Sequence, residues 1–71
     1  MSSDIKKRFG ARVRELRLER KMSQIALAEK AGIEQQHLSN LELGKKEAKI
    51  KVIEMLAIGL GVSLRQLFWD L

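Results

Sequence analysis

A chain of 71 residues without cysteine allows one small domain and excludes disulfides and thiolate metal sites. No apolar run approaches the roughly 20 residues of a membrane span, and the N-terminus lacks the apolar stretch of a signal peptide, so we expect a soluble, cytoplasmic protein. The net charge of +5 comes entirely from residues 1–46, with eleven basic and six acidic residues, whereas residues 47–71 carry three of each. This distribution favours an N-terminal part that faces a polyanion. The alternative is that its basic helices are simply solvated.

The first predicted helix covers about residues 5–21. Its apolar residues recur at steps of four, four and three: Ile5, Phe9, Val13 and Leu16. This spacing gives one apolar stripe and a basic opposite face. Gly10 lies inside the helix, where glycine costs about 1 kcal/mol relative to alanine. We therefore expect Gly10 at a close contact with another element.

Serine and glycine residues delimit the next two predicted helices. Ser23 is a suitable N-cap for a helix over residues 24–31, because its hydroxyl can accept from the free amides of the first turn. Gly32 ends this helix by adopting a positive φ. A third helix covers about residues 35–43 and ends at Gly44.

The same signals predict two more helices. A polar connection leads to a fourth helix over about residues 49–60, which Gly61 ends. Ser63 and Gln66 have the capping-box spacing at the start of a short last helix over about residues 64–70. The sequence therefore predicts an all-α fold of five helices in a single domain, residues 1–71.

The fourth predicted helix is apolar on two faces. One face is the expected core: Ile50, Ile53, Leu56, Ala57 and Leu60. The opposite face carries Val52, Met55, Ile58 and Gly59. A helix that is apolar nearly all round is buried nearly all round, and a monomer of this size would leave the second face uncovered. We expect this face, with Trp69 and Leu71, to form a homodimer interface; a slightly apolar free surface is the alternative.

An ordered set of residues resembles a known DNA-binding motif. The matching positions are Arg14 to Arg17, Ser23-Gln24, Leu27-Ala28, Gly32-Ile33, Leu41-Glu42, Gly44 and Gly61 to Phe68. They are similar to the helix-turn-helix of phage Cro proteins, lambdoid repressors and the related Xre-type bacterial regulators. The resemblance covers about residues 9–68. It implies a compact, lambda-repressor-like DNA-binding domain whose second and third helices form the helix-turn-helix.

The third predicted helix has a face suited to base recognition. Leu38 and Leu41 share one side, and short uncharged polar residues lie largely on the other: Gln35, Gln36, Ser39 and Asn40. Amide side chains donate and accept at once, so they can pair bidentately with adenine in the major groove of double-stranded DNA. We expect these four residues to contact bases; an ordinary solvated face is the alternative.

The resemblance implies further roles. Gln24 corresponds to a glutamine that holds a phosphate and braces the recognition helix. We expect phosphate contacts from Gln24 and its neighbour Ser23, and from Lys45 and Lys46 just past the third helix. Relatives also pair an arginine with a glutamate at the positions of Arg17 and Glu42, which implies a partly buried ion pair with a structural role.

These features predict a sequence-specific transcription regulator that acts as a homodimer on a partly palindromic operator in a bacterial or phage-infected cell. It would be a repressor or a restriction-modification controller. One alternative is an antitoxin that binds its own operator and a toxin through the C-terminal helices; another is a DNA-independent module using Phe68 and Trp69. The single histidine, His37, has no partner ligands, and no paired acids or glycine-rich phosphate loop occur. We therefore expect no catalytic residue, metal or cofactor.

Overall fold

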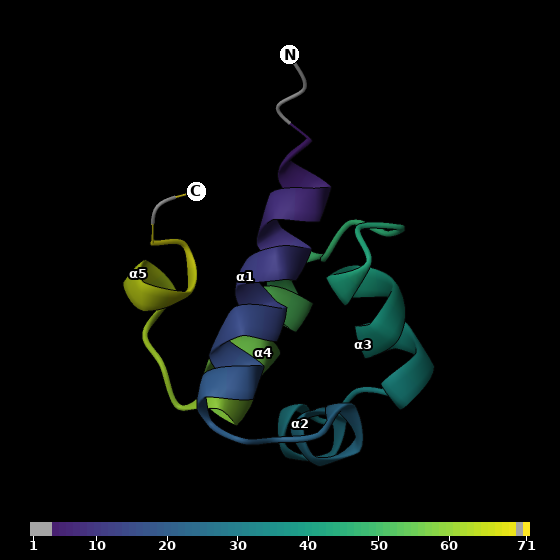
Figure 1. Cartoon of the computed structure of the whole chain (residues 1–71), viewed down its shortest axis with the longest axis vertical. Coiled ribbons are helices and arrows are strands. Elements are labelled where there is room, and N and C mark those ends of the chain that lie inside the picture. The colour runs from purple at the N-terminus through teal and green to yellow at the C-terminus, as the bar shows by residue number, and fades with distance from the viewer. Residues whose placement is uncertain (1–3, 70) are drawn as a thin grey trace.

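Five α-helices follow one another in the computed structural model, which describes residues 4–69 and 71. They are α1 (Ile5–Glu19), α2 (Gln24–Ala31), α3 (Gln35–Glu42), α4 (Ile50–Leu60) and α5 (Leu64–Leu67). In Figure 1, α1 stands between α3 and α5, with α4 behind it and α2 at its lower end. The residues described include no strand, so the predicted all-α fold is confirmed. None of these helices is long and apolar enough to cross a membrane.

The predicted caps and stops occur where the sequence places them. Ser23 Oγ accepts from the Ala26 amide at 3.0 Å, and Ser63 Oγ accepts from the Gln66 amide at 3.0 Å. Gly32 has a φ of 78° at the end of α2, a conformation that costs glycine least. These local signals set the order and approximate length of the helices.

Several predicted helices extend one to three residues beyond those in the structure. α1 ends at Glu19, because the chain turns at Lys21, whose φ is 56°. α3 and α5 end before Leu43 and Phe68, which are their C-caps. α4 begins one residue later than predicted, since Lys49 is its N-cap. The predicted end of the last helix, residue 70, lies outside the described residues.

The core is mainly aliphatic, with Phe9 as its aromatic member, and draws on all five helices. Its fully buried side chains are Val13, Leu16, Leu27, Leu38, Leu41, Leu56 and Leu67. Each such side chain contributes about 1.5–3 kcal/mol relative to an exposed one. Leu38 and Leu41 anchor α3 in this core, so the opposite face of α3 is left for solvent or a ligand.

A close backbone contact joins α1 to the C-terminal end of α3. A Cβ on Gly10 would lie 2.2 Å from the Leu41 carbonyl oxygen and 2.7 Å from that of Glu42. At the end of α3, a Cβ on Gly44 would lie 2.9 Å from the Cα of Lys7. The close contact predicted at Gly10 is confirmed, and it fixes how far α3 stands from α1.

Two predictions about the apolar faces were wrong. Ile50 was placed in the core, but it is 86% exposed at the first turn of α4. Val52 and Met55 were placed on an uncovered face, but they pack partly buried against the core. Gly59 lies against α2, where an added Cβ would be 3.0 Å from the Ala31 amide nitrogen.

The second apolar face of α4 was predicted wrongly because the sequence does not show the position of α2. Sequence spacing gives the angles between side chains on α4 but does not show which neighbour covers each face. Here α2 packs across the Met55 and Gly59 side of α4, so α2 covers part of the face predicted for a second copy, while Ile58 on that face stays exposed. The predicted stripe of α1 also begins with an exposed residue, since Ile5 is 49% accessible.

Gly10→Ala tests the backbone contact between α1 and α3. Helix propensity alone would stabilise this variant by about 1 kcal/mol. The clash with two carbonyl oxygens should reverse the sign and lower the free energy of unfolding by roughly 1–3 kcal/mol. Urea denaturation followed by circular dichroism measures the difference. A variant more stable than the wild type would show that α1 and α3 do not approach this closely.

Candidate nucleic-acid interface

The outer face of α3 presents the polar residues predicted to contact bases. Gln35 and Gln36 are exposed, and Ser39 and Asn40 are partly exposed. Gln36 Nε2 donates to Asn40 Oδ1 across one helical turn at 3.4 Å. The face therefore offers hydroxyl and amide groups with donors and acceptors still available for an external partner.

The N-terminal end of α2 lies beside this face. Ser23 is exposed, and its hydroxyl caps the helix while its own hydrogen stays available to donate. Gln24 donates its side-chain amide to Glu42 Oε1 at 3.0 Å, which braces α3 against α2. The first amides of a helix point outward with partial positive charge and attract anions.

A buried ion pair joins α1 to α3. Arg17 Nε donates to Glu42 Oε2 at 2.7 Å, and Arg17 Nη2 donates to Glu42 Oε1 at 3.0 Å. The two side chains are only 9% and 2% exposed. Arg17 Nη1 also donates to the Met22 carbonyl at 2.9 Å. One guanidinium therefore holds α1, the α1–α2 turn and α3 together, in the bidentate geometry that favours arginine.

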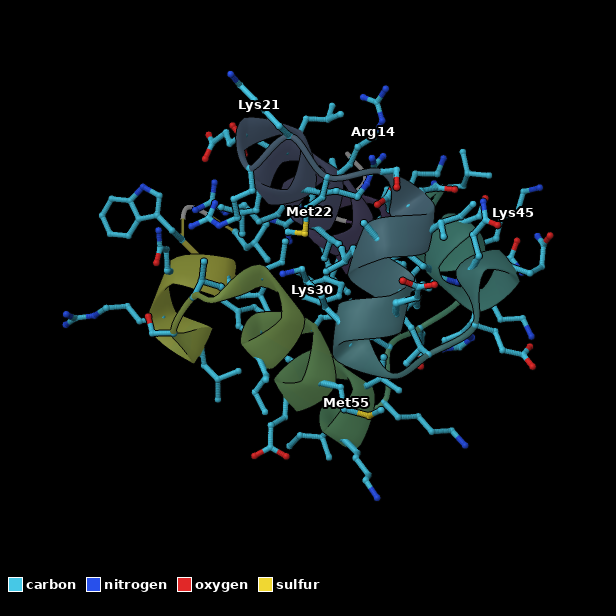
Figure 2. All side chains as sticks on the ribbon, turned by 90° about the horizontal axis from the view of Figure 1, so that it is seen from below. Arg14, Lys21, Met22, Lys30, Lys45 and Met55 are labelled. Carbon is cyan, nitrogen blue, oxygen red and sulfur yellow. The ribbon has the colours of Figure 1, made fainter. Side chains whose placement is uncertain are left out.

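Two exposed lysines follow α3. The Lys45 amide donates to the Asn40 carbonyl at 2.9 Å, which turns the chain directly after the helix. Lys45 extends outward at the α3 side of the molecule (Figure 2), and Lys46 is also exposed. His37 is partly buried on α3, and the described residues contain no group of ligands that could hold a metal ion.

The structure divides the residues predicted for the dimer interface. Ile58 and Trp69 are 71% and 67% exposed, and Leu71 is partly buried. Val52, Met55 and Gly59 are only partly exposed, and Met55 and Gly59 lie against α2, so they offer less free surface than Ile58 and Trp69. A different group of exposed or partly exposed apolar side chains, called here the apolar patch, lies over α4, α5 and the start of α1: Ile5, Ile50, Ile53, Leu64 and Phe68.

The short last helix in the sequence could have predicted this patch. On α5, only Leu67 is fully buried, because a helix of four residues has one inward side. Leu64 and Phe68 flank it and are 51% and 40% exposed. A short terminal helix with three large apolar residues therefore presents apolar surface whichever residue points inward.

The sequence profile of the family described as helix-turn-helix matches residues 13–67. The chain belongs to the helix-turn-helix family. It is 34% identical to control protein C.MunI of Mycoplasma sp over 70 residues, which cover 97% of this chain and 95% of that protein. It is also 33% identical to the immunity repressor protein of Bacillus phage phi105 over 55 residues, 78% of this chain and 38% of the repressor.

Solved structures agree with this assignment. The crystal structure of the restriction-modification controller protein C.AhdI from Aeromonas hydrophila matches with a TM-score of 0.86 at 34% identity, over 94% of this chain and all of that one. The resemblance inferred from the sequence is confirmed: α2 and α3 are the helix-turn-helix of a DNA-binding transcription regulator.

Arg17→Met tests the energetic importance of the buried pair in this helix-turn-helix protein. The change leaves the Glu42 carboxylate buried with one remaining partner, Gln24, and should lower the free energy of unfolding by about 3–5 kcal/mol. Adding Glu42→Leu should restore part of that loss, because no unpaired charge is left behind.

Chemical denaturation of the single and double variants measures this coupling. The exposed Glu29→Gln serves as the control and should change stability by no more than about 0.5 kcal/mol. If the two losses simply add in the double variant, Arg17 and Glu42 do not act as a pair.

Proposed function

We propose that this regulator binds a partly palindromic operator as a homodimer, with α3 of each copy in a major groove of double-stranded DNA. It regulates transcription in the bacterial cytoplasm by occupying that site rather than by catalysing a reaction. The observation that carries the proposal is the polar outer face of α3, held in a fixed orientation by a buried ion pair at its C-terminal end.

Base contacts are proposed for the polar face. Gln35 and Gln36 lie at the start of α3, where a recognition helix meets base edges. Ser39 and Asn40 lie one turn further along. The Gln36 to Asn40 hydrogen bond limits the rotamers of both side chains, so less conformational freedom is lost when they meet a base.

Phosphate contacts are proposed on both sides of that face. Ser23 and Gln24 stand at the N-terminal end of α2, and Lys45 and Lys46 stand beyond the C-terminal end of α3. A recognition helix in the groove places these two sites near the backbones that border it. Such contacts set the register and supply affinity that depends on salt, whereas the base contacts supply discrimination.

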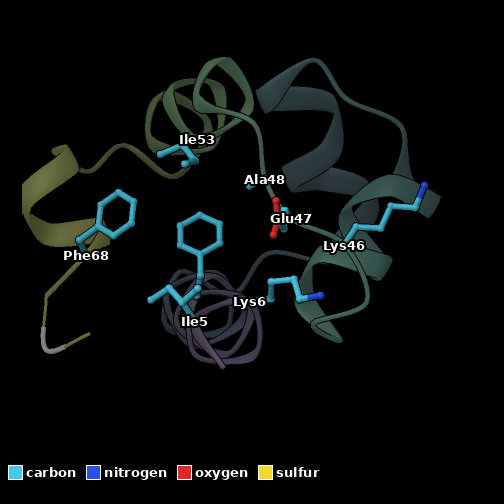
Figure 3. Close-up of a pocket in the computed structure, with 8 residues that line it drawn as sticks. Ile5, Lys6, Lys46, Glu47, Ala48, Ile53 and Phe68 are labelled. Carbon is cyan, nitrogen blue, oxygen red and sulfur yellow. The ribbon is translucent and has the colours of Figure 1, made fainter. Parts of the chain in front are cut away.

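The apolar patch is the proposed dimer interface. Ile50, Leu64 and Phe68 are all at least 40% exposed, and they share an apolar depression of about 520 Å³ with Ile53. A second depression of about 310 Å³ continues the patch to Ile5, and Figure 3 shows Ile5, Ile53 and Phe68 gathered around it. Apolar surface gathered in this way marks an interface more often than scattered exposed residues do.

A second copy is the partner that the charges favour. Lys51 and Glu54 border the same depression as Ile50, so the patch carries one charge of each sign. In a twofold contact, Lys51 of one copy can meet Glu54 of the other. The neighbouring helix α5 lies on the opposite side of α1 from α3 (Figure 1), so this contact leaves the recognition face open.

The relatives favour the controller type of regulator. This chain covers 95% of control protein C.MunI and all of C.AhdI, but only 38% of the phage repressor. Because this chain aligns with two controllers over nearly their whole length, it contains a counterpart of nearly every segment of both. We therefore propose that it controls a restriction-modification system.

Gln36→Ala and Lys46→Ala should affect DNA binding differently. Gln36→Ala removes a bidentate partner and should reduce discrimination at one base pair by roughly 1–3 kcal/mol. Lys46→Ala should weaken binding to all sequences alike and lower the dependence of log K on log salt by about 0.9 for each copy bound. Fluorescence anisotropy with the preferred duplex and single-base variants measures both effects; the opposite pattern would contradict the assigned roles.

Ile50→Glu should convert the dimer to a monomer, because it places a charge in the apolar patch of each copy. The control is Ile58→Glu, a change of the same kind about 12 Å further along α4. Both side chains are more than two-thirds exposed, so both variants should fold normally. Sedimentation equilibrium decides: dissociation by Ile58→Glu but not by Ile50→Glu would place the interface on the other side.

A further inference from the structure

One arginine of α1 has no role in the fold or in the contacts proposed above. Arg12 donates to the Gln66 carbonyl at 2.8 Å and pairs with Glu15 at 2.9 Å. Arg8 donates to the Leu71 carbonyl, and Arg17 pairs with Glu42. Arg14 differs: it is exposed, and its side chain makes no hydrogen bond or ion pair with the residues in 4–69 and 71.

The helix itself provides no acid that could neutralise Arg14. Side chains three and four residues apart are neighbours on a helix surface. For Arg14 these neighbours are a glycine, an alanine, an arginine and a leucine, at residues 10, 11, 17 and 18. By contrast, Arg12 has Glu15 three residues later. The Arg14 guanidinium is therefore free to meet an external anion.

The contacts of α1 place Arg14 beside the helix-turn-helix formed by α2 and α3. Gly10, four residues before it, lies against the last carbonyls of α3. Arg17, three residues after it, binds Glu42, which in turn binds Gln24 at the start of α2. Arg14 lies between these two residues in sequence, about 40° around the helix from Gly10 and about 4.5 Å along the axis from Arg17. Arg14 thus stands at the solvent edge of the stripe that faces α3 and the start of α2.

Figure 2 agrees with this placement. Arg14 projects outward at the side of the molecule away from Met55, and Lys45 extends from the α3 side. The start of α2, where an anion would meet Ser23, is joined to Arg17 through two hydrogen-bonded links, Gln24 to Glu42 and Glu42 to Arg17. Arg14 lies one helical turn before Arg17 on α1. A DNA strand that passes the N-terminus of α2 and runs along α3 would therefore come within reach of the exposed Arg14 side chain on α1.

We propose that Arg14 binds a phosphodiester of the operator next to the one that meets the N-terminus of α2. This inference rests on the proposed DNA-binding function and extends the contact surface from the helix-turn-helix to α1. The ligand is a pair of non-bridging phosphate oxygens, which match the planar donor fork of a guanidinium. Because every sequence presents the same phosphates, the contact adds affinity and register without base preference.

The test compares Arg14→Gln with Lys30→Gln, a matched loss of one exposed cation in the last turn of α2. Anisotropy titrations use the preferred duplex and a scrambled duplex over a range of salt concentrations. Arg14→Gln should bind both duplexes about three- to tenfold more weakly, and its salt slope should fall by about one for each copy bound. Lys30→Gln should keep the wild-type slope, and Arg14→Lys should retain it because the charge is kept.

A neutral methylphosphonate at single positions then locates the contact. One substitution, adjacent to the phosphate that responds to Ser23→Ala, should weaken the wild type and leave Arg14→Gln unaffected. If Arg14→Gln has the affinity and slope of Lys30→Gln, the inference is wrong while DNA binding stands. If the wild type itself shows no salt-dependent binding to either duplex, the proposed function fails first.

Discussion

The bidentate contact between Arg17 and Glu42 is the interaction on which the arrangement of α1, α2 and α3 depends. Its two hydrogen bonds, at 2.7 and 3.0 Å, lie between side chains that are almost fully buried. Through Gln24 the same carboxylate also reaches α2. Removing two charges from water is costly unless every partner is present. The arrangement therefore favours one relative position of α1, α2 and α3 over others that would leave a charge unpaired.

The mainly aliphatic core and the close contact at Gly10 also fix the position of α3 relative to α1. Leu38 and Leu41 hold the inner side of α3 in the core, while Gly10 lets the end of α3 approach the backbone of α1. Neither uses the outer side of α3. Stability is thus supplied by one face and the proposed recognition by the other, so the polar residues proposed to contact DNA can vary without loss of the fold. This separation explains how one small scaffold can present different recognition sequences.

The sequence alone predicted most of the helices and the candidate residues on α3, because these depend on local chemistry. Serine caps and glycine stops act within one turn, and the polar face of α3 follows from helical spacing. The surface of α4 could not be predicted in this way. Whether Val52 and Gly59 face solvent or another helix depends on where α2 crosses, which is a property of the whole packing. Helical spacing likewise did not show that Ile50 is exposed, whereas the exposed Leu64 and Phe68 of the apolar patch could have been predicted from the shortness of the last helix.

The most direct test of the account is selection of bound duplexes from a random pool by the wild-type protein. Two copies joined through the apolar patch present their α3 helices on one side of the DNA, in successive major grooves about 34 Å apart. We predict an enriched sequence with two inverted half-sites separated by one turn of the duplex. A single half-site without symmetry, or no enriched sequence at all, would contradict the account of a dimer that recognises bases through α3.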